Sequence, residues 1–206
     1  MANDVSRCNI SKWRLLRMTL RCMFFQSSWN YRYFQGLGWT VALLPELRLL
    51  YSPDKLPLVV KRYLKYFNTN TFLAPSVAGA TLALELDQCR GNSPPIAADA
   101  YAEAIMAPVA AVGDALFWGG IRPFCSCLAV ALAAYNFWWS PLVLVVLFSL
   151  SALIFRVLGA WIGYQRGAAA IEVIARSRLA DVAMVLKRVT VVMLGGLCAV
   201  LVHSGD

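Results

Sequence analysis

Charged side chains are scarce in this sequence. Asp, Glu, Lys and Arg make up 15% of the 206 residues, against about 25% in soluble domains. The sequence also has a single histidine, His203. A catalytic or metal site built on histidine is therefore not expected, and the low charge argues against a soluble globular domain.

Motifs that carry chemistry are missing as well. The sequence has no glycine-rich phosphate loop, no nucleophile elbow and no pair of carboxylates at catalytic spacing. Its cysteines show neither paired metal spacing nor the framework of a small secreted domain; they are Cys8, Cys22, Cys89, Cys125, Cys127 and Cys198. We therefore expect no catalytic residues, no metal and no cofactor. The protein is predicted not to be an enzyme in its own right.

Apolar residues are abundant instead. They make up 60% of the sequence, and mean hydropathy is +0.61. Residues 1–65 hold eleven Lys/Arg and three Asp/Glu, which gives +8, whereas residues 66–206 hold eight of each and are neutral. Cations in front of apolar segments favour membrane lipid as a partner over nucleic acid, and predict that the N-terminus faces the cytoplasm. The chain is predicted to be an integral membrane protein.

The basic N-terminal third contains two stretches with helical periodicity. Residues 11–25 place three arginines on one side and Trp13 with other apolar residues on the opposite side, and Ser11 is a candidate cap. A turn is predicted at residues 52–54, and a second amphipathic helix is expected over residues 58–67. Such helices either lie in a membrane interface or pack on protein with a solvated basic face, and the pattern does not decide between the two. Between them, Pro45 and Glu46 are expected to interrupt an apolar stretch over residues 38–50.

No charge occurs from Pro123 to Phe155, a run of 33 residues interrupted at residues 136–141. Each half is short for a straight span, so either a broken or re-entrant pair of helices or a plain hairpin could form. Beyond it, glycines at 159 and 163 offer a surface for close helix packing, as Gly79 does earlier.

The C-terminal part divides into two patterns. Residues 171–188 are mixed and basic, and predict an amphipathic surface helix, while residues 189–202 are apolar. The fold class is therefore all-α, with amphipathic N-terminal helices followed by transmembrane and broken or re-entrant helices. Three parts are expected: a basic arm over residues 1–25, a membrane domain over 26–167, and an amphipathic helix with a terminal apolar segment over 168–206.

Two groups of polar residues are candidates for a site. Asp114 and Arg122 are isolated among apolar residues at the start of the uncharged run, so they either form a polar element in the membrane domain or Asp114 caps a helix beginning at Ala115. Gln26, Trp29 and Asn30 could hold a polar ring through amide hydrogen bonds and one aromatic face; alternatively, they belong to an interfacial aromatic belt.

An ordered series of motifs runs from about Met18 to Gly167. It comprises FQSSWNY from Phe25, QGLGW from Gln35, LPELRLLY from Leu44, YFNT from Tyr66, AP at Ala74, GATLALE from Gly79, MAP at Met106, GD at Gly113, FWG at Phe117 and RP at Arg122. Together these motifs resemble the enzyme IID membrane subunit of the mannose/fructose/sorbose family of bacterial sugar phosphotransferase systems.

The resemblance implies a function and a set of partners. A IID subunit joins a IIC subunit in a hetero-oligomeric permease of the bacterial inner membrane that translocates a hexose-type sugar. Cytoplasmic IIA/IIB components supply the phosphate, and IID carries no phosphorylated residue of its own. The motifs add Trp118, and more weakly Asn68, as candidates for substrate binding or translocation.

The sequence also departs from the family pattern. Alanines 107, 111 and 115 stand where Gly, Gly and Pro are usual, and Ser149 and Ala152 replace a common Asn and Arg. Family members are also expected to continue beyond the apolar segment near residue 200, so the chain is expected to be shortened relative to them. These departures leave an alternative function, a non-transporting regulatory or scaffold protein derived from a IID subunit.

Overall fold

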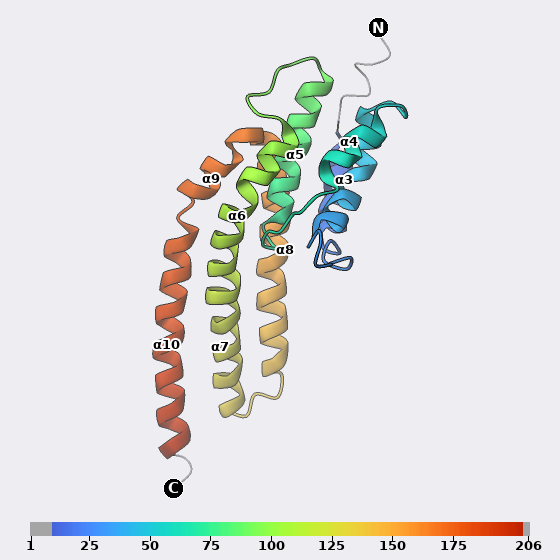
Figure 1. Cartoon of the computed structure of the whole chain (residues 1–206). Coiled ribbons are helices and arrows are strands. Elements are labelled where there is room, and N and C mark those ends of the chain that lie inside the picture. Colours follow the sequence, from blue (N-terminus) through green and yellow to red (C-terminus); the bar gives the residue numbers. More distant parts are fainter. Residues whose placement is uncertain (1–9, 204–206) are drawn as a thin grey trace.

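The computed structural model describes residues 10–203, so Cys8 and most of the first ten residues of the predicted basic arm lie outside it. Helices joined by loops make up the described part (Figure 1). Its elements are α2 (Lys12–Cys22), α3 (Gly36–Leu50), α4 (Leu56–Tyr63), α5 (Ala74–Cys89), α6 (Ala98–Leu116), the π-helical turn η1 (Phe117–Ile121), α7 (Arg122–Ala134), α8 (Ser140–Arg166), the 3-10 turn η2 (Gly167–Ala169), α9 (Ala170–Arg176) and α10 (Leu179–His203).

The first amphipathic helix forms and is capped by Ser11, but it ends at Cys22, three residues before its predicted end. The Ser11 hydroxyl accepts a hydrogen bond from the backbone N–H of Arg14 at 3.4 Å. Leu15 and Met18 are buried against the rest of the protein, while Trp13 is 73% exposed. The helix therefore packs on protein through one apolar side and presents a second apolar side outward, so it combines features of both alternatives.

Helix α3 is continuous through Pro45, and the expected interruption there is wrong. Pro45 removes one backbone donor from the helix. In the preceding turn, the side chain of Arg21 donates from Nε to the carbonyl of Ala42 at 3.1 Å, and the same guanidinium pairs with the buried carboxylate of Glu46. This contact joins α2 to the turn before Pro45, while the carbonyl that Pro45 leaves without a helical donor is the neighbouring one of Val41.

The second amphipathic helix, α4, ends at Tyr63, four residues before its predicted end. The chain then runs through residues 64–73 outside any helix. There Phe67 forms a single β-bridge with Phe34 of the loop between α2 and α3, and Phe34 forms a second bridge with Asn30 of the same loop. The Ser52–Asp54 turn before α4 is present as expected.

Small residues bring α5 and α8 into direct backbone contact. A methyl group built on Gly163 would lie 2.1 Å from the carbonyl oxygen of Ser76, and one on Gly79 would lie 2.2 Å from that of Ala160. Helix α5 is buried along most of its length. The predicted close-packing surfaces at positions 79 and 163 are therefore confirmed, and they meet each other.

Helices α6, η1 and α7 form one continuous stretch, Ala98–Ala134, which is long and apolar enough to cross a membrane. The absence of proline at position 115 fits this continuity, because α6 runs through Ala115 unbroken. The chain turns at residues 135–139, with Asn136 at φ +62°, and enters α8. The two halves of the uncharged run therefore form a helical hairpin, and each half is continued by helix on its far side.

The C-terminal helices differ from the prediction. The boundary between α9 and α10 lies at Ser177 and Arg178, with Arg178 at φ +54°, and residues 179–203 form one 25-residue helix. The expected helix over residues 171–188 is therefore wrong: the Ser177 hydroxyl donates to the Ile174 carbonyl at 2.6 Å and helps to end α9, while Arg178 pairs with Asp181 in the first turn of α10.

Helix α10 runs parallel to α7. Gly120 lies against Ala183, and the thiol of Cys127 lies 4.0 Å from the carbonyl of Thr190. In Figure 1, α7, α8 and α10 extend downward side by side, away from the remaining helices. Residues 168–203 are thus packed against the preceding domain, although the predicted three-part division itself stays a prediction.

Two regions can be distinguished. We call residues 10–116 the packed region, and we call residues 122–155 together with 179–203 the apolar arm. Within Ser140–Val200, an 18-residue stretch apolar enough to span a membrane has a mean hydropathy of 2.5, and only 6% of it is buried. A soluble core helix of that composition would be buried, so these exposed apolar surfaces indicate contact with lipid.

Candidate functional site

The centre of the candidate site is the non-helical segment of residues 66–72, which is held by the side chain of Gln35. Gln35 is 3% exposed, donates from Nε2 to the carbonyl of Thr69 at 3.1 Å and accepts from the N–H of Thr69 at 2.8 Å. A side-chain amide can match a backbone amide in this way, satisfying a donor and an acceptor together. Gln35 therefore fixes the segment as a neighbouring strand would.

On its other side the same segment is attached to α6. The Thr69 hydroxyl donates to the carbonyl of Met106 at 2.9 Å, and the Asn70 amide donates to Oδ1 of Asp114 at 2.8 Å. The side-chain oxygen of Asn70, Oδ1, accepts from the N–H of Phe72 at 2.9 Å. Asn70 thus connects the segment that leads into α5 with the carboxylate of Asp114.

A glycine makes this approach possible. A methyl group built on Gly113 would lie 2.4 Å from both Cβ and Cγ of Asn70. Any larger residue at 113 would push the Asn70 side chain away from Asp114. The Gly-Asp pair therefore has a physical explanation: glycine provides room and aspartate provides the acceptor.

Neither alternative for Asp114 and Arg122 describes their contacts fully. Asp114 lies inside α6, so it does not cap a helix beginning at Ala115, and that expectation is wrong. Among the described residues, no ion pair joins Asp114 to Arg122. Eight residues correspond to about 12 Å along a helix axis, too far for a direct contact. Asp114 bonds Asn70, and the Arg122 guanidinium stacks on the ring of Trp118 at 5.3 Å.

Trp118 belongs to an aromatic cluster beside this hydrogen bond. It is 45% exposed, and its ring centroid lies 5.5 Å from that of Phe72. The guanidinium of Arg156 on α8 covers the ring of Phe72 at 4.7 Å. Two arginines therefore flank an aromatic pair at η1, with Trp118 and Arg122 accessible from outside.

The second predicted group lies on the loop between α2 and α3. Asn30 uses its side chain locally: Oδ1 accepts from the N–H groups of Arg32 at 3.1 Å and Tyr33 at 2.9 Å. Trp29 is 44% exposed and makes an edge contact with Phe34 at 5.3 Å. Gln26 is exposed. Local turn formation explains Asn30, whereas Trp29 and Gln26 stay available for a ligand.

Both groups border the same segment. Phe34 pairs with Phe67 at one end, and Asp114 reaches Asn70 at the other. Asn68 lies between these attachments, and the structure gives its partly exposed side chain no hydrogen bond within residues 10–203. Six of the seven predicted residues thus belong to the two groups on either side of residues 66–72, and the seventh, Asn68, lies within that segment.

The sequence interpretation missed the connecting residues Thr69 and Asn70, and gave Gln35 too little weight. The available signal was a row of three polar residues, 68–70, between apolar neighbours. Because Asn and Thr favour turns, the row by itself predicts only the end of a helix. Its long-range role depends on Gln35 and Asp114, which lie 34 and 44 positions away from their partners.

A separate buried cluster surrounds Glu85, which is fully buried on α5. Its carboxylate accepts from the hydroxyls of Tyr51 and Tyr63 and from Arg62 at 3.0 Å. Burial and the Glu85 charge raise the pKa of both tyrosines. Burial lowers the pKa of Arg62, but Glu85 together with Tyr63 and Tyr51 outweighs burial, so the net pKa of Arg62 is raised. These groups stay protonated, so the cluster holds a carboxylate in place.

Metal binding finds no support within the described residues, where no three His, Cys, Asp or Glu side chains gather at a metal-binding distance. The fold and the candidate site define a helical membrane protein in which a polar segment, residues 66–72, is held beside the start of the apolar arm. Comparison with known proteins identifies which one: the family profile for the PTS system mannose/fructose/sorbose family IID component matches residues 9–204. The chain belongs to that family.

Individual relatives agree with this assignment. The chain is 36% identical over 153 residues to the mannose-specific EIID component of Escherichia coli K12, covering 72% of this chain and 53% of the relative. It is 29% identical over 174 residues to the fructose permease IID component of Bacillus subtilis, covering 82% and 62%. The chain thus spans about half the length of the curated relatives it matches.

Solved structures share the fold. A chain in the cryo-EM structure of the mannose transporter ManYZ with microcin E492 matches at a TM-score of 0.72 and 29% identity, covering 92% of this chain and 70% of that one. A structure described as a membrane protein matches at a TM-score of 0.81 with the same identity and coverage. The all-α membrane fold predicted from the sequence is confirmed.

Proposed function

We propose that this chain acts as the IID-type subunit of a mannose-class sugar phosphotransferase permease. In this proposal it translocates a hexose-type sugar together with a IIC subunit in the bacterial inner membrane, while cytoplasmic IIA/IIB components phosphorylate the sugar. The chain itself contributes no phosphorylation site. The comparisons lend no support to the alternative of a non-transporting scaffold.

The observation that carries the proposal is the hydrogen bond between Asn70 and Asp114. Asp114 belongs to the Gly-Asp motif by which the sequence resembles IID subunits, and it connects α6 to the segment that begins α5. Trp118, Arg122 and Asn68 lie along this connection with exposed or partly exposed side chains. An aromatic face with nearby polar groups suits a polar ring such as a sugar.

Uptake of radiolabelled mannose tests the proposal. The chain would be supplied with a IIC partner to a strain that lacks its own IID subunit. We expect uptake with the natural chain and none with Asp114→Asn, because the amide cannot offer the charged acceptor to Asn70. Asp181→Asn is the matched control, since Asp181 pairs with Arg178 on the exposed surface.

The uptake results distinguish a role for Asp114 from a transport function of the whole chain. Uptake with the natural chain and normal uptake with Asp114→Asn would remove Asp114 from the site but keep the permease. Assembly with the IIC partner without any uptake would instead support the scaffold alternative. For the N-terminal group, Trp29→Ala should weaken sugar binding by the reconstituted complex; an unchanged affinity would return Trp29 to the aromatic-belt interpretation.

Orientation is the final part of the proposal. We infer that the packed region faces the cytoplasm, because it carries the cationic excess. The tip between α7 and α8 then faces the opposite side, with Trp138 88% exposed. In a variant with Cys198 replaced by Ser, a cysteine at 138 should react with an impermeant maleimide in intact cells, and one at Lys55 only after permeabilisation. The reverse pattern would overturn this orientation.

A further inference from the structure

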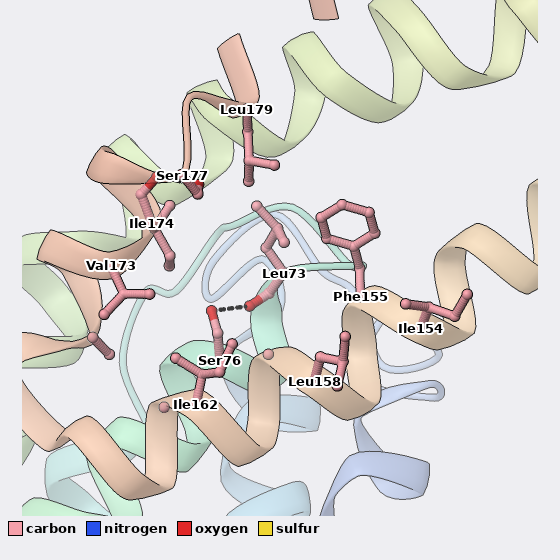
Figure 2. Close-up of a pocket in the computed structure, with 13 residues that line it drawn as sticks. Leu73, Ser76, Ile154, Phe155, Leu158, Ile162, Val173, Ile174, Ser177 and Leu179 are labelled. Carbon is pink, nitrogen blue, oxygen red and sulfur yellow. Dashed lines mark hydrogen bonds between the residues drawn. The ribbon is translucent and has the colours of Figure 1, made fainter. Parts of the chain in front are cut away.

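An apolar cavity of about 160 Å³ lies beneath α9, where the chain crosses from α8 to α10. Figure 2 shows Val173 and Ile174 of α9 on one side and Phe155, Leu158 and Ile162 of α8 on the other. Its size is comparable to that of an engineered protein cavity of about 150 Å³ that stays dry and binds benzene. The cavity is therefore large enough for a small apolar group.

The lining offers a ligand almost no polar partner. Two hydroxyls reach it, and each already donates to a backbone carbonyl: Ser76 to Leu73 at 2.6 Å, drawn as the dashed line in Figure 2, and Ser177 to Ile174 at 2.6 Å. Burying a polar ligand group there would leave that group without a hydrogen bond, which is unfavourable. The occupant must be apolar.

The cavity is continuous with the surface that faces lipid. Ile154 and Leu158 line it and are 46% and 54% exposed, and Val182 on α10, three residues beyond the lining residue Leu179, is 47% exposed. An apolar chain lying along α8 and α10 can therefore enter without crossing a polar surface. The outer side of α9 carries exposed Glu172 and Arg176, so the cavity lies below a charged cover.

We propose that this cavity binds the end of a phospholipid acyl chain. A lipid acyl chain fits both the apolar lining and the opening of the cavity, because it is apolar, flexible and present at the surface from which the cavity opens. Side chains of a partner helix would be the other apolar source. They are less suited, because α9 covers the cavity and a rigid helix would have to thread a side chain beneath it.

The test uses the full chain, purified into bilayer nanodiscs that contain a phospholipid with a diazirine near the end of its acyl chain. After illumination, mass spectrometry should place most lipid adducts on peptides covering Phe155–Ile162 and Val173–Leu179. Ile174→Trp and Leu179→Phe each fill the cavity. Excluding about two methylene groups should lower labelling about tenfold. Leu150→Trp is the matched control, since Leu150 is 51% exposed on α8 outside the cavity.

Three results decide the matter. Labelling concentrated at the cavity and lost in both filling variants supports the proposal, and phosphatidylglycerol and phosphatidylcholine probes should behave alike because the head group is not held. Labelling spread evenly along the exposed face of α8 would overturn it. So would a photoreactive residue at Leu158 that cross-links to another protein rather than to lipid in native membranes.

Discussion

The packed region buries paired carboxylates and exposes charge, whereas the apolar arm exposes apolar residues. In the packed region, carboxylates such as Glu46 and Glu85 are buried and hydrogen-bonded, while Lys61 is exposed. In the arm, valines such as Val191 and Val192 are 69% and 75% exposed. Lipid favours exposed apolar side chains and disfavours exposed charges. The contrast indicates that the arm contacts lipid, whereas the packed region also borders water.

The largest expected effect concerns the buried carboxylate. Glu85→Ala leaves Arg62 and two tyrosine hydroxyls without their acceptor, and should lower the free energy of unfolding by about 3–5 kcal/mol. Unfolding in detergent, followed by tryptophan fluorescence, measures this. Glu172→Ala removes an exposed ion pair with Arg176 and should cost less than about 1 kcal/mol. Equal effects of the two variants would contradict the internal role of Glu85.

A charge placed on the arm should have the next largest effect. Val192→Lys puts an ammonium group on an apolar surface predicted to lie in lipid, at a cost of about 2.5–3.5 kcal/mol. Membrane insertion is the measurement. Leu58→Lys is the comparison, because Leu58 is 72% exposed but lies on basic α4 in the packed region. Normal insertion of Val192→Lys would indicate that α10 faces water or a polar partner.

Close packing distinguishes Gly163, where α8 meets α5 of the packed region, from Gly195 in the arm. Gly163→Ala forces a methyl group against the Ser76 carbonyl, and overpacking of this kind costs about 1–3 kcal/mol. Gly195→Ala in the arm meets nothing within 4 Å and should stabilise α10 slightly through helix propensity. Thermal unfolding in detergent compares the two. A harmless Gly163→Ala would mean that α5 and α8 are less tightly packed than the structure shows.

The smallest expected effect is at the start of α2. Ser11→Ala removes a cap whose hydrogen bond is long and exposed. The loss should be near the low end for such caps, about 0.5 kcal/mol. Ser11→Asp should recover it. A loss comparable to that of Glu85→Ala would show that α2 depends on this cap rather than on packing through Leu15 and Met18.

The sequence predicted the parts of this fold that depend on local pattern. Ser11, the turn at 52–54, the break near 136–141 and the small residues at 79 and 163 all act as expected. Predictions failed where a distant partner decides the outcome. Pro45 does not interrupt α3, and Arg21 from α2 contacts that helix on both sides of the proline, at Ala42 and Glu46.

The same reason explains what was missed in the candidate site. Asp114 was identified by its isolation, but its partner could not be, because Asn70 is brought to it only by the packing of α5 against α6. Arg122 was a natural partner by charge, yet helix geometry keeps the two apart and places the guanidinium on Trp118. Composition indicated the candidate site, and tertiary contacts determined the connections of its residues.

One measurement tests the contrast between the two regions most directly. Spin labels would be attached at native Cys198 and, in a Cys198→Ser chain, at Val192 and Val145 in the arm and at Lys61 and Lys55 in the packed region. Their collision rates with oxygen and with a water-soluble nickel complex would then be compared in bilayers. We expect collisions with oxygen to be favoured at positions 145 and 192 and collisions with the nickel complex at positions 55 and 61. Nickel-favoured collisions along the arm would contradict it.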